Sequence, residues 1–85
     1  MKTFQTTYKG REIIVENRWF KGEKLYVDGS LQDENRGLSF RSSLYGVLPA
    51  ENGSEETLKA SVGGGLLRVQ CSIFAGHKLI YSSSD

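Results

Sequence analysis

The sequence predicts an all-β fold, either a small antiparallel β-sandwich or a partly open β-barrel of seven to eight strands in a meander. Apolar residues recur at every second position in several short stretches, which is the period of a half-buried strand. Glycine-centred turns separate these stretches, and one of them, Asp28-Gly29, is a strong hairpin signal because both residue types tolerate a positive φ. No window has the sustained 3.6-residue spacing of an amphipathic helix.

The N-terminal part of the chain predicts four short strands. Residues 4–9 alternate apolar and polar side chains and lead through a glycine turn into 11–16, whose β-branched residues favour a strand. After a connection that carries two large aromatic residues, a third strand covers 24–27, and the Asp-Gly turn leads into a fourth over 30–32. Residues 33–37 are polar, and we expect a turn there.

The middle of the chain predicts two longer strands. Residues 38–48 alternate with their apolar side chains on one face, and Gly46 marks a position for a bulge or a bend. Pro49 ends this strand because proline has no N–H to donate to a ladder. Residues 50–56 form either an acidic hairpin loop or a single helical turn, and the next strand alternates over 58–62.

The C-terminal part begins with Gly63–Gly65, which breaks the alternation. The strongest strand pattern follows over 67–73, where four apolar residues share one face. A turn at Ala75-Gly76 leads into a last strand over 77–81, and 82–85 is a polar tail that we expect to fray.

A single hydrophobic core follows from this alternation, because the inward side chains of all the strands meet between the layers. Residues 1–85 are therefore predicted to form one β domain. One of Leu79 and Ile80 is expected to join its core. The other predicted core residues are Phe4, Ile13, Val15, Trp19, Leu25, Val27, Leu38, Phe40, Leu58, Val62, Leu67, Val69, Cys71 and Ile73.

Composition and charge narrow the function classes. The chain has 11 basic and 10 acidic residues and a formal net charge of +1, whereas nucleic-acid binders concentrate more positive charge on one face. One cysteine permits no internal disulfide, and no stretch approaches the ~20 apolar residues of a membrane-spanning helix. The N-terminus has no apolar run of signal-peptide length. We therefore expect a cytoplasmic protein without membrane contact.

Catalytic and metal-binding chemistry find little support in the sequence. Cys71 and His77 are the only residues of their types, and a turn at Ala75-Gly76 would leave their side chains roughly 10 Å or more apart, too far for a nucleophile and its base. Cys71 also lies on the apolar face of its strand, where a thiol packs as a small hydrophobe. One cysteine and one histidine do not supply a zinc site. We expect no catalytic residues, no metal and no cofactor.

Carboxylates and glycines are more numerous but lack the required spacing. The acidic residues near Asp28 and in the loop over 50–56 do not follow the alternate positions of a calcium loop. Gly63–Gly65 has no following lysine and hydroxyl residue that would make a phosphate loop. A flexible hairpin loop is the expected role of these glycines, with small-ligand binding or enzyme activity near them as an alternative.

A basic and aromatic group offers the best candidate for a binding surface. Its aromatic rings provide large amphipathic contacts of the kind enriched at protein interfaces, or platforms on which nucleic-acid bases stack. The other interpretation is that Trp19 and Phe20 close one end of the core. The candidate partner-binding residues are Arg18, Trp19, Phe20, Lys21, Tyr26 and Arg41.

The sequence thus favours a non-catalytic intracellular interaction module that binds a protein partner or a second copy of itself. The edge strands of a short meander are able to accept a partner strand. The alternatives are single-stranded nucleic-acid binding through the basic-aromatic face, and a small-ligand or enzyme site near Gly63–Gly65.

Overall fold

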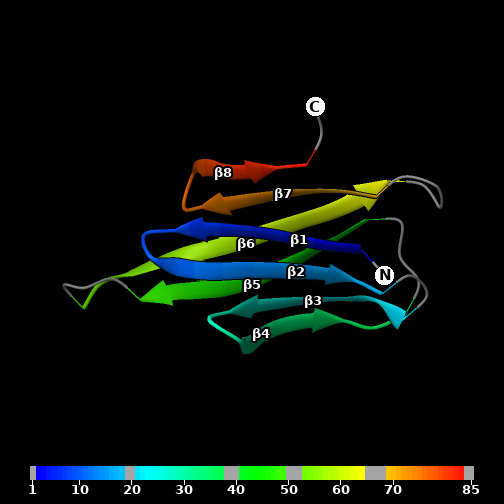
Figure 1. Cartoon of the computed structure of the whole chain (residues 1–85), viewed down its shortest axis with the longest axis horizontal. Helices are drawn as coiled ribbons and strands as arrows, with labels where there is room; N and C mark the ends of the chain where they lie inside the picture. Colours follow the sequence, from blue (N-terminus) through cyan, green and yellow to red (C-terminus); the bar gives the residue numbers. More distant parts are fainter. Residues whose placement is uncertain (1, 19–20, 38–40, 50–52, 65–68, 84–85) are drawn as a thin grey trace.

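Eight β-strands form two four-stranded antiparallel sheets, each connected as a meander (Figure 1). The computed structural model describes residues 2–18, 21–37, 41–49, 53–64 and 69–83. The first sheet contains β1 (Lys2–Tyr8), β2 (Arg11–Asn17), β3 (Glu23–Val27) and β4 (Ser30–Asn35), in that order. The second contains β5 (Arg41–Pro49), β6 (Glu55–Gly64), β7 (Val69–Ala75) and β8 (Lys78–Ser82). The all-β prediction is confirmed, in the form of a small sandwich.

Two of the predicted hairpin turns lie where the sequence places them. Lys9 and Gly10 have φ values of 51° and 78°, and Asp28 and Gly29 have values of 50° and 84°. Positive φ at both central residues defines the type I′ turn, whose twist matches that of the strands it joins. Each turn therefore fixes the register of its hairpin.

The third predicted turn is displaced by one residue. Ala75 is still in β7 and pairs with Lys78 of β8, so the turn consists of Gly76 and His77. Gly76 has the positive φ, +60°, and its N–H donates to the carbonyl oxygen of Thr57. Ala75 is buried, which keeps it in the strand.

The C-terminal tail was expected to begin at Ser82, but it begins later in the structure. Ser82 is the last residue of β8 and pairs with Ser72. The backbone N–H of Ser83 donates to the carbonyl oxygen of Cys71 at 2.9 Å, and its Oγ accepts from the backbone N–H of Cys71 at 2.7 Å. Residues 84–85 lie outside the described residues.

The polar segment predicted as a turn over 33–37 instead continues β4 as far as Asn35. These polar residues stay in the strand because their side chains bond to other strands. Asp33 accepts from the backbone of Tyr45, and Asn35 donates to Glu23. The prediction from polarity alone therefore ended this strand too early.

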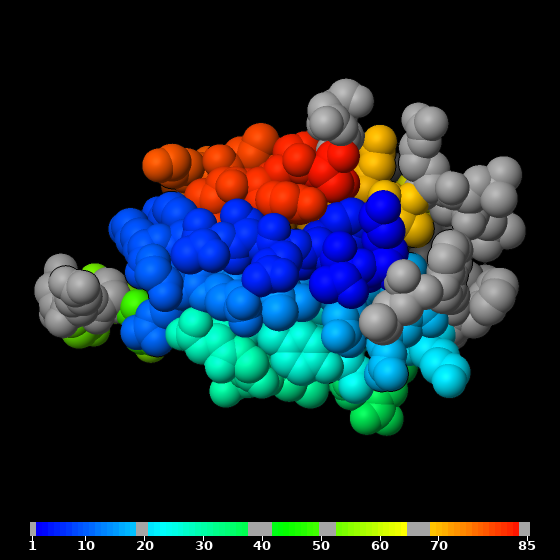
Figure 2. Space-filling view, in the orientation of Figure 1, coloured from blue at the N-terminus to red at the C-terminus, as the bar shows by residue number. Residues whose placement is uncertain are grey.

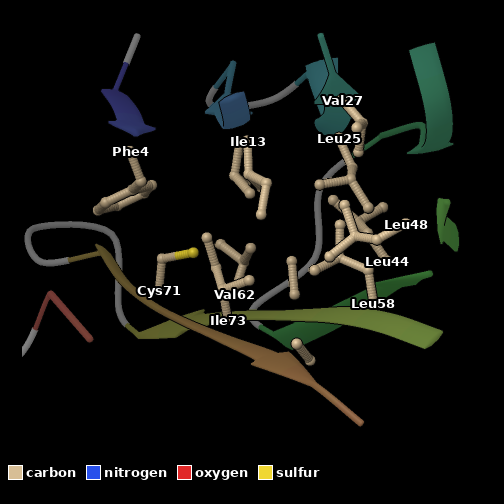
Figure 3. Close-up of a cluster of buried hydrophobic side chains, with 13 residues drawn as sticks. Phe4, Ile13, Leu25, Val27, Leu44, Leu48, Leu58, Val62, Cys71 and Ile73 are labelled. Atoms are coloured by element: carbon tan, nitrogen blue, oxygen red, sulfur yellow. The ribbon is translucent and has the colours of Figure 1, made fainter. Parts of the chain in front are cut away.

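The core lies between the two sheets and matches most of the prediction (Figure 3). Buried as predicted are Phe4, Ile13, Val15, Leu25, Val27, Leu58, Val62, Cys71 and Ile73. Ile80 packs partly buried against this cluster, whereas Leu79 is exposed, and Val69 is half-buried. The sequence analysis missed Leu44, Leu48, Ala60 and Ala75. The predicted core residues Trp19, Leu38, Phe40 and Leu67 lie outside the described residues.

Gly46 is not a bulge, since β5 pairs with β6 in an unbroken register from Arg41 to Pro49. A Cβ at Gly46 would lie 3.2 Å from the Cβ of Gln32, so the glycine leaves room for a side chain of the other sheet. Because the alternation is unbroken, Leu44 and Leu48 both point inward.

The two sheets are displaced sideways relative to each other. Viewed across the layers, β7 and β8 lie beyond β1 on one side, and β4 lies beyond β5 on the other (Figure 1). Each sheet therefore has one edge strand, β4 in the first and β8 in the second, that projects past the edge of the other sheet.

Candidate functional site

The candidate residues Arg18 and Lys21 lie in the connection between β2 and β3, and both are exposed. The connection is a tight turn, in which the backbone N–H of Arg18 donates to Gly22 at 2.8 Å and that of Lys21 donates to Arg18 at 3.0 Å. Trp19 and Phe20 lie outside the described residues. Their assignment to the core or to an interface stays a prediction.

Tyr26 and Arg41 come from other parts of the sandwich. Tyr26 points away from the core on the outer face of the first sheet, between its strand partners Ile14 and Leu31. It lies three residues along β3 from Glu23, or roughly 10 Å from the connection that carries Lys21. Arg41 begins β5 in the second sheet, and its side chain lies outside the described part of the structure. The binding face proposed from sequence stays a prediction.

The cysteine and the histidine do not form a nucleophile and base. Cys71 is 1% exposed, and burial raises the pKa of its thiol to about 12, so the thiol stays protonated at neutral pH. His77 is exposed in the turn after β7, and Ala75, which precedes that turn, is four residues from Cys71, or roughly 14 Å along the strand. The structural interpretation of Cys71 is thus confirmed.

The described part of the glycine segment takes part in strand pairing, and the carboxylates of the described residues form no metal site. Gly63 lies between Arg41 of β5 and Gln70 of β7, and Gly64, with φ of +128°, pairs with Val69. Gly65 lies outside the described residues. Over the described ranges, no three or more His, Cys, Asp or Glu side chains gather as a metal site.

One buried carboxylate connects the two sheets. Glu23 is 2% exposed, and its carboxylate accepts hydrogen bonds from Asn17 Nδ2 at 3.2 Å, from Asn35 Nδ2 at 3.1 Å and from the hydroxyl of Ser42. These partners come from β2, β4 and β5. Buried charges are tolerated when such partners replace water. Glu23 lies just before the strand predicted over 24–27, and its alternation with Leu25 is the signal that points its side chain inward.

One edge of the sandwich is closed by side chains. Asp33 Oδ2 accepts from the backbone N–H of Tyr45 at 2.9 Å, and Gln32 Oε1 accepts from that of Val47 at 3.4 Å. Both acceptors lie in β4, next to a register shift between Leu25 and Tyr26 of β3. Two outward N–H groups of β5, those of Tyr45 and Val47, are therefore already occupied by the first sheet.

The β8 edge is blunted in a different way. This strand is only five residues long, its pairing with β7 shifts register between Ile73 and Phe74, and it begins with Lys78. Short length, an irregular register and lysine are the devices that keep edge strands from pairing with other chains.

The β1 edge differs in length and in register, although it too begins with a lysine, Lys2. All seven residues of β1 pair with β2 in one unbroken register. Because a two-residue type I′ turn closes with the hydrogen-bonded pair Tyr8–Arg11, bonding to β2 alternates back along β1 from Tyr8. The backbone N–H and C=O groups of Thr3, Gln5 and Thr7 therefore point outward. No side chain of the described residues hydrogen-bonds to them.

Aromatic and basic side chains surround this edge. Phe4 of β1 contacts Tyr81 of β8 edge-on, with ring centroids 6.4 Å apart. At the start of β1, Lys2 Nζ lies 5.8 Å from the Phe4 ring centroid, and at its end Lys78 Nζ lies 6.0 Å from the Tyr8 ring centroid. Figure 2 shows the residues of β8 directly beside β1 on this face.

The end of β1 is also tied to the second sheet by an exposed ion pair. Lys9 Nζ lies 2.9 Å from Glu56 Oε1, and the Tyr8 hydroxyl donates to Glu56 Oε2 at 3.3 Å. The hydrogen bond from Lys9 is the main cause that lowers the pKa of Glu56, and Glu56 in turn raises the pKa of Lys9. This contact holds the β1–β2 hairpin against β6.

No helix in the described part of the chain is long and apolar enough to cross a membrane. Comparison with known protein families, with curated proteins and with solved structures finds no match for this chain.

Proposed function

We propose that this protein is a non-catalytic interaction module that binds an extended segment of a partner protein at the edge of β1. The single observation that carries the proposal is the open row of backbone groups at Thr3, Gln5 and Thr7. In strand addition, main-chain hydrogen bonds supply affinity and alternate side chains supply specificity. An unbroken seven-residue strand provides both.

The contrast between the edges supports this choice of surface. The outward N–H groups of Tyr45 and Val47 in β5 are occupied by Asp33 and Gln32, and β8 is short and irregular in register. Long, regular and uncovered edges are uncommon in folded proteins because they promote aggregation. An edge left open where that of β5 is capped at two positions and that of β8 is blunted is best explained by use.

A pair of variants at Gln5 tests the proposal. The backbone N–H of Gln5 points outward, so Gln5→Pro removes a donor from the free edge and none from the ladder with β2. Gln5→Thr keeps the donor, and both variants lose the same side-chain bond from Gln5 Nε2 to Glu12. Any difference between them therefore reports on the edge.

The measurement is capture from an extract of the source cell on immobilised protein, with quantitative mass spectrometry. We expect a protein that is retained by the unchanged chain and by Gln5→Thr but lost by Gln5→Pro. Circular dichroism and thermal melting establish that both variants fold. Equal retention by the two folded variants would show that the edge is not the binding surface.

A further inference from the structure

The structure also points to the chemistry of the occupant. We infer that the β1 edge takes a single extended segment with apolar residues at alternate positions and carboxylates near both ends, in preference to β1 of a second copy. This inference rests on the proposed function. It follows from three features of the edge: the strand that projects beside it, the side chains on that strand, and the charges at its ends.

The projecting strand disfavours a second copy. Two β1 strands paired antiparallel are related by a two-fold axis perpendicular to the sheet, so both second sheets would lie in the same layer. Because β8 lies beyond β1 in each copy (Figure 1), the two β8 strands would occupy the same space. A lone strand has no second layer of its own and meets no such clash.

Because β8 projects beyond β1, it also offers apolar side chains that a single added strand could contact. Ile80 and Tyr81 of β8 pack against the edge of the core but are only half-buried. No strand of the first sheet lies above β8, since β1 is the last strand on that side (Figure 3). Alternate side chains of a strand added to β1 would point into the layer of Ile80 and Tyr81. Apolar side chains at those positions complete the burial.

Positive charge marks both ends of the edge. Lys2 lies at the start of β1 and Lys78 beside its end, and neither is within salt-bridge distance of a carboxylate of the described residues, although Lys78 is near enough to Glu56 to help lower the pKa of that carboxyl. Lys9, by contrast, is paired with Glu56. From Lys2 to Tyr8 the strand spans six residue steps, or roughly 20 Å. An extended segment with carboxylates six residues apart matches this separation.

A synthetic peptide tests the inference directly. The probe is acetyl-ETVTVTE-amide, in which the two valines share one face of the strand with the two terminal glutamates, and its β-branched residues favour an extended conformation. The controls are the same peptide with lysine at both ends and one with proline at the central position. Binding is measured by isothermal titration calorimetry and by backbone amide NMR of the full chain.

We expect saturable binding of the acidic peptide, with slowed amide exchange at Thr3, Gln5 and Thr7. The lysine-ended and proline-containing peptides are expected to bind at least about tenfold more weakly, as is the acidic peptide to Gln5→Pro. Lys2→Gln and Lys78→Gln each weaken binding several-fold, and Lys59→Gln, an exposed change on β6, leaves it unchanged. Equal binding of the acidic and basic peptides overturns the charge assignment.

Light scattering separates the remaining outcomes. A monomer across the accessible concentration range is expected. A dimer that Gln5→Pro abolishes would overturn the choice of a lone segment in favour of a second copy. If no acidic peptide binds while cellular capture remains sensitive to Gln5→Pro, this inference fails and the proposed function stands. If capture is also insensitive, both fail.

Discussion

The carboxylate of Asp33, in the first sheet, accepts a hydrogen bond from the backbone N–H of Tyr45, in the second sheet, at 2.9 Å. A side chain thus takes the place that a neighbouring strand would otherwise occupy at the edge of β5. Together with Gln32 it caps two N–H groups at the edge of β5, whereas β1 pairs with β2 over seven residues without such caps on its outer edge. The edge strands of β5 and β1 therefore differ in how they present their backbone groups.

Removing this cap should open the second edge. In Asp33→Ala the N–H of Tyr45 loses its acceptor, and Tyr45 and Val47 are 53% and 41% exposed beside it. We expect a loss of about 1 kcal/mol in the free energy of unfolding and concentration-dependent self-association at the β5 edge. Urea denaturation and light scattering measure the two effects.

Asp33→Asn is the matched control for the cap, because its amide keeps one acceptor oxygen. It should remain monomeric and lose less stability than the alanine variant. If Asp33→Ala is also monomeric at high concentration, the side-chain cap does not protect the edge.

The buried carboxylate of Glu23 should matter more for stability than any exposed one. Glu23→Gln replaces one acceptor oxygen by an NH₂ group, which then faces either the donor of Asn17, at Oε2, or those of Asn35 and Ser42, at Oε1. An unsatisfied buried polar group costs about 1–3 kcal/mol, so we expect a loss in that range by urea denaturation. Glu16→Gln, the same change at a less buried position in β2, should cost under about 0.5 kcal/mol.

A loss no larger than that of the Glu16 control would mean that the polar cluster does not hold the sheets together. The Ser42→Ala variant then separates the partners, because Ser42 is the contact from the second sheet. We expect it to lower stability by less than Glu23→Gln, since it removes one donor and leaves the carboxylate two others.

Two glycines with positive φ should respond very differently to alanine. A Cβ at Gly22, where φ is +98°, would lie 1.8 Å from the carbonyl oxygen of Asn35, whereas one at Gly10, where φ is +78°, meets no atom within 4 Å. Gly10→Ala pays only the left-handed backbone strain, about 1–2 kcal/mol. Gly22→Ala also forces β4 away from the connection, and we expect more than about 3 kcal/mol or failure to fold.

Thermal melting of the two glycine variants checks this difference. Equal destabilisation would show that backbone strain dominates and that the close approach to Asn35 relaxes at little cost. The comparison is informative because both positions have similar φ and differ mainly in the space around them.

Much of the fold was predictable because the alternation of apolar and polar residues in the sequence directly indicates which side chains are buried. Ile13 and Val15, or Cys71 and Ile73, identify the inner face without any knowledge of the partner strands. The type I′ turns were also predictable from local sequence, because residue pairs such as Asp28-Gly29 favour the positive φ values that this turn requires. Leu44 and Leu48 were not predicted to be buried because a bulge or a bend was expected at Gly46. The structure shows a different reason for this glycine, which is the close approach of Gln32 from the other sheet.

The candidate binding edge was less predictable, because its properties depend on how the sheets are placed. The sequence indicated that a meander has edge strands, but not that Asp33 and Gln32 close one of them. Nor does any local pattern reveal that β8 projects beyond β1. Glu23 shows the intermediate case, since alternation with Leu25 points it inward while its partners come from three other strands.

The ion pair between Lys9 and Glu56 gives the last prediction, a pH dependence of stability. The pKa of Glu56 is lowered in the folded state from its ordinary value of 4.5, mainly by the hydrogen bond from Lys9. The folded state therefore binds this proton less readily than the unfolded state. The contribution is present above pH 4.5 and is lost as the pH falls through the folded-state pKa.

The pKa of Lys9 is raised above 10.5, chiefly by the same hydrogen bond, so its contribution is complete below pH 10.5 and is lost as the pH rises beyond it. Urea denaturation of the unchanged chain and of Glu56→Gln at pH 7 and at pH 2.5 tests the statement about Glu56. We expect the unchanged chain to be more stable than Glu56→Gln at pH 7 and the difference to shrink towards pH 2.5, as the pH falls through the folded-state pKa of Glu56. Because both groups are exposed, 0.5 M salt at pH 7 should reduce the difference as well. A difference that persists unchanged at pH 2.5 would show that Glu56 acts through packing and not through its charge.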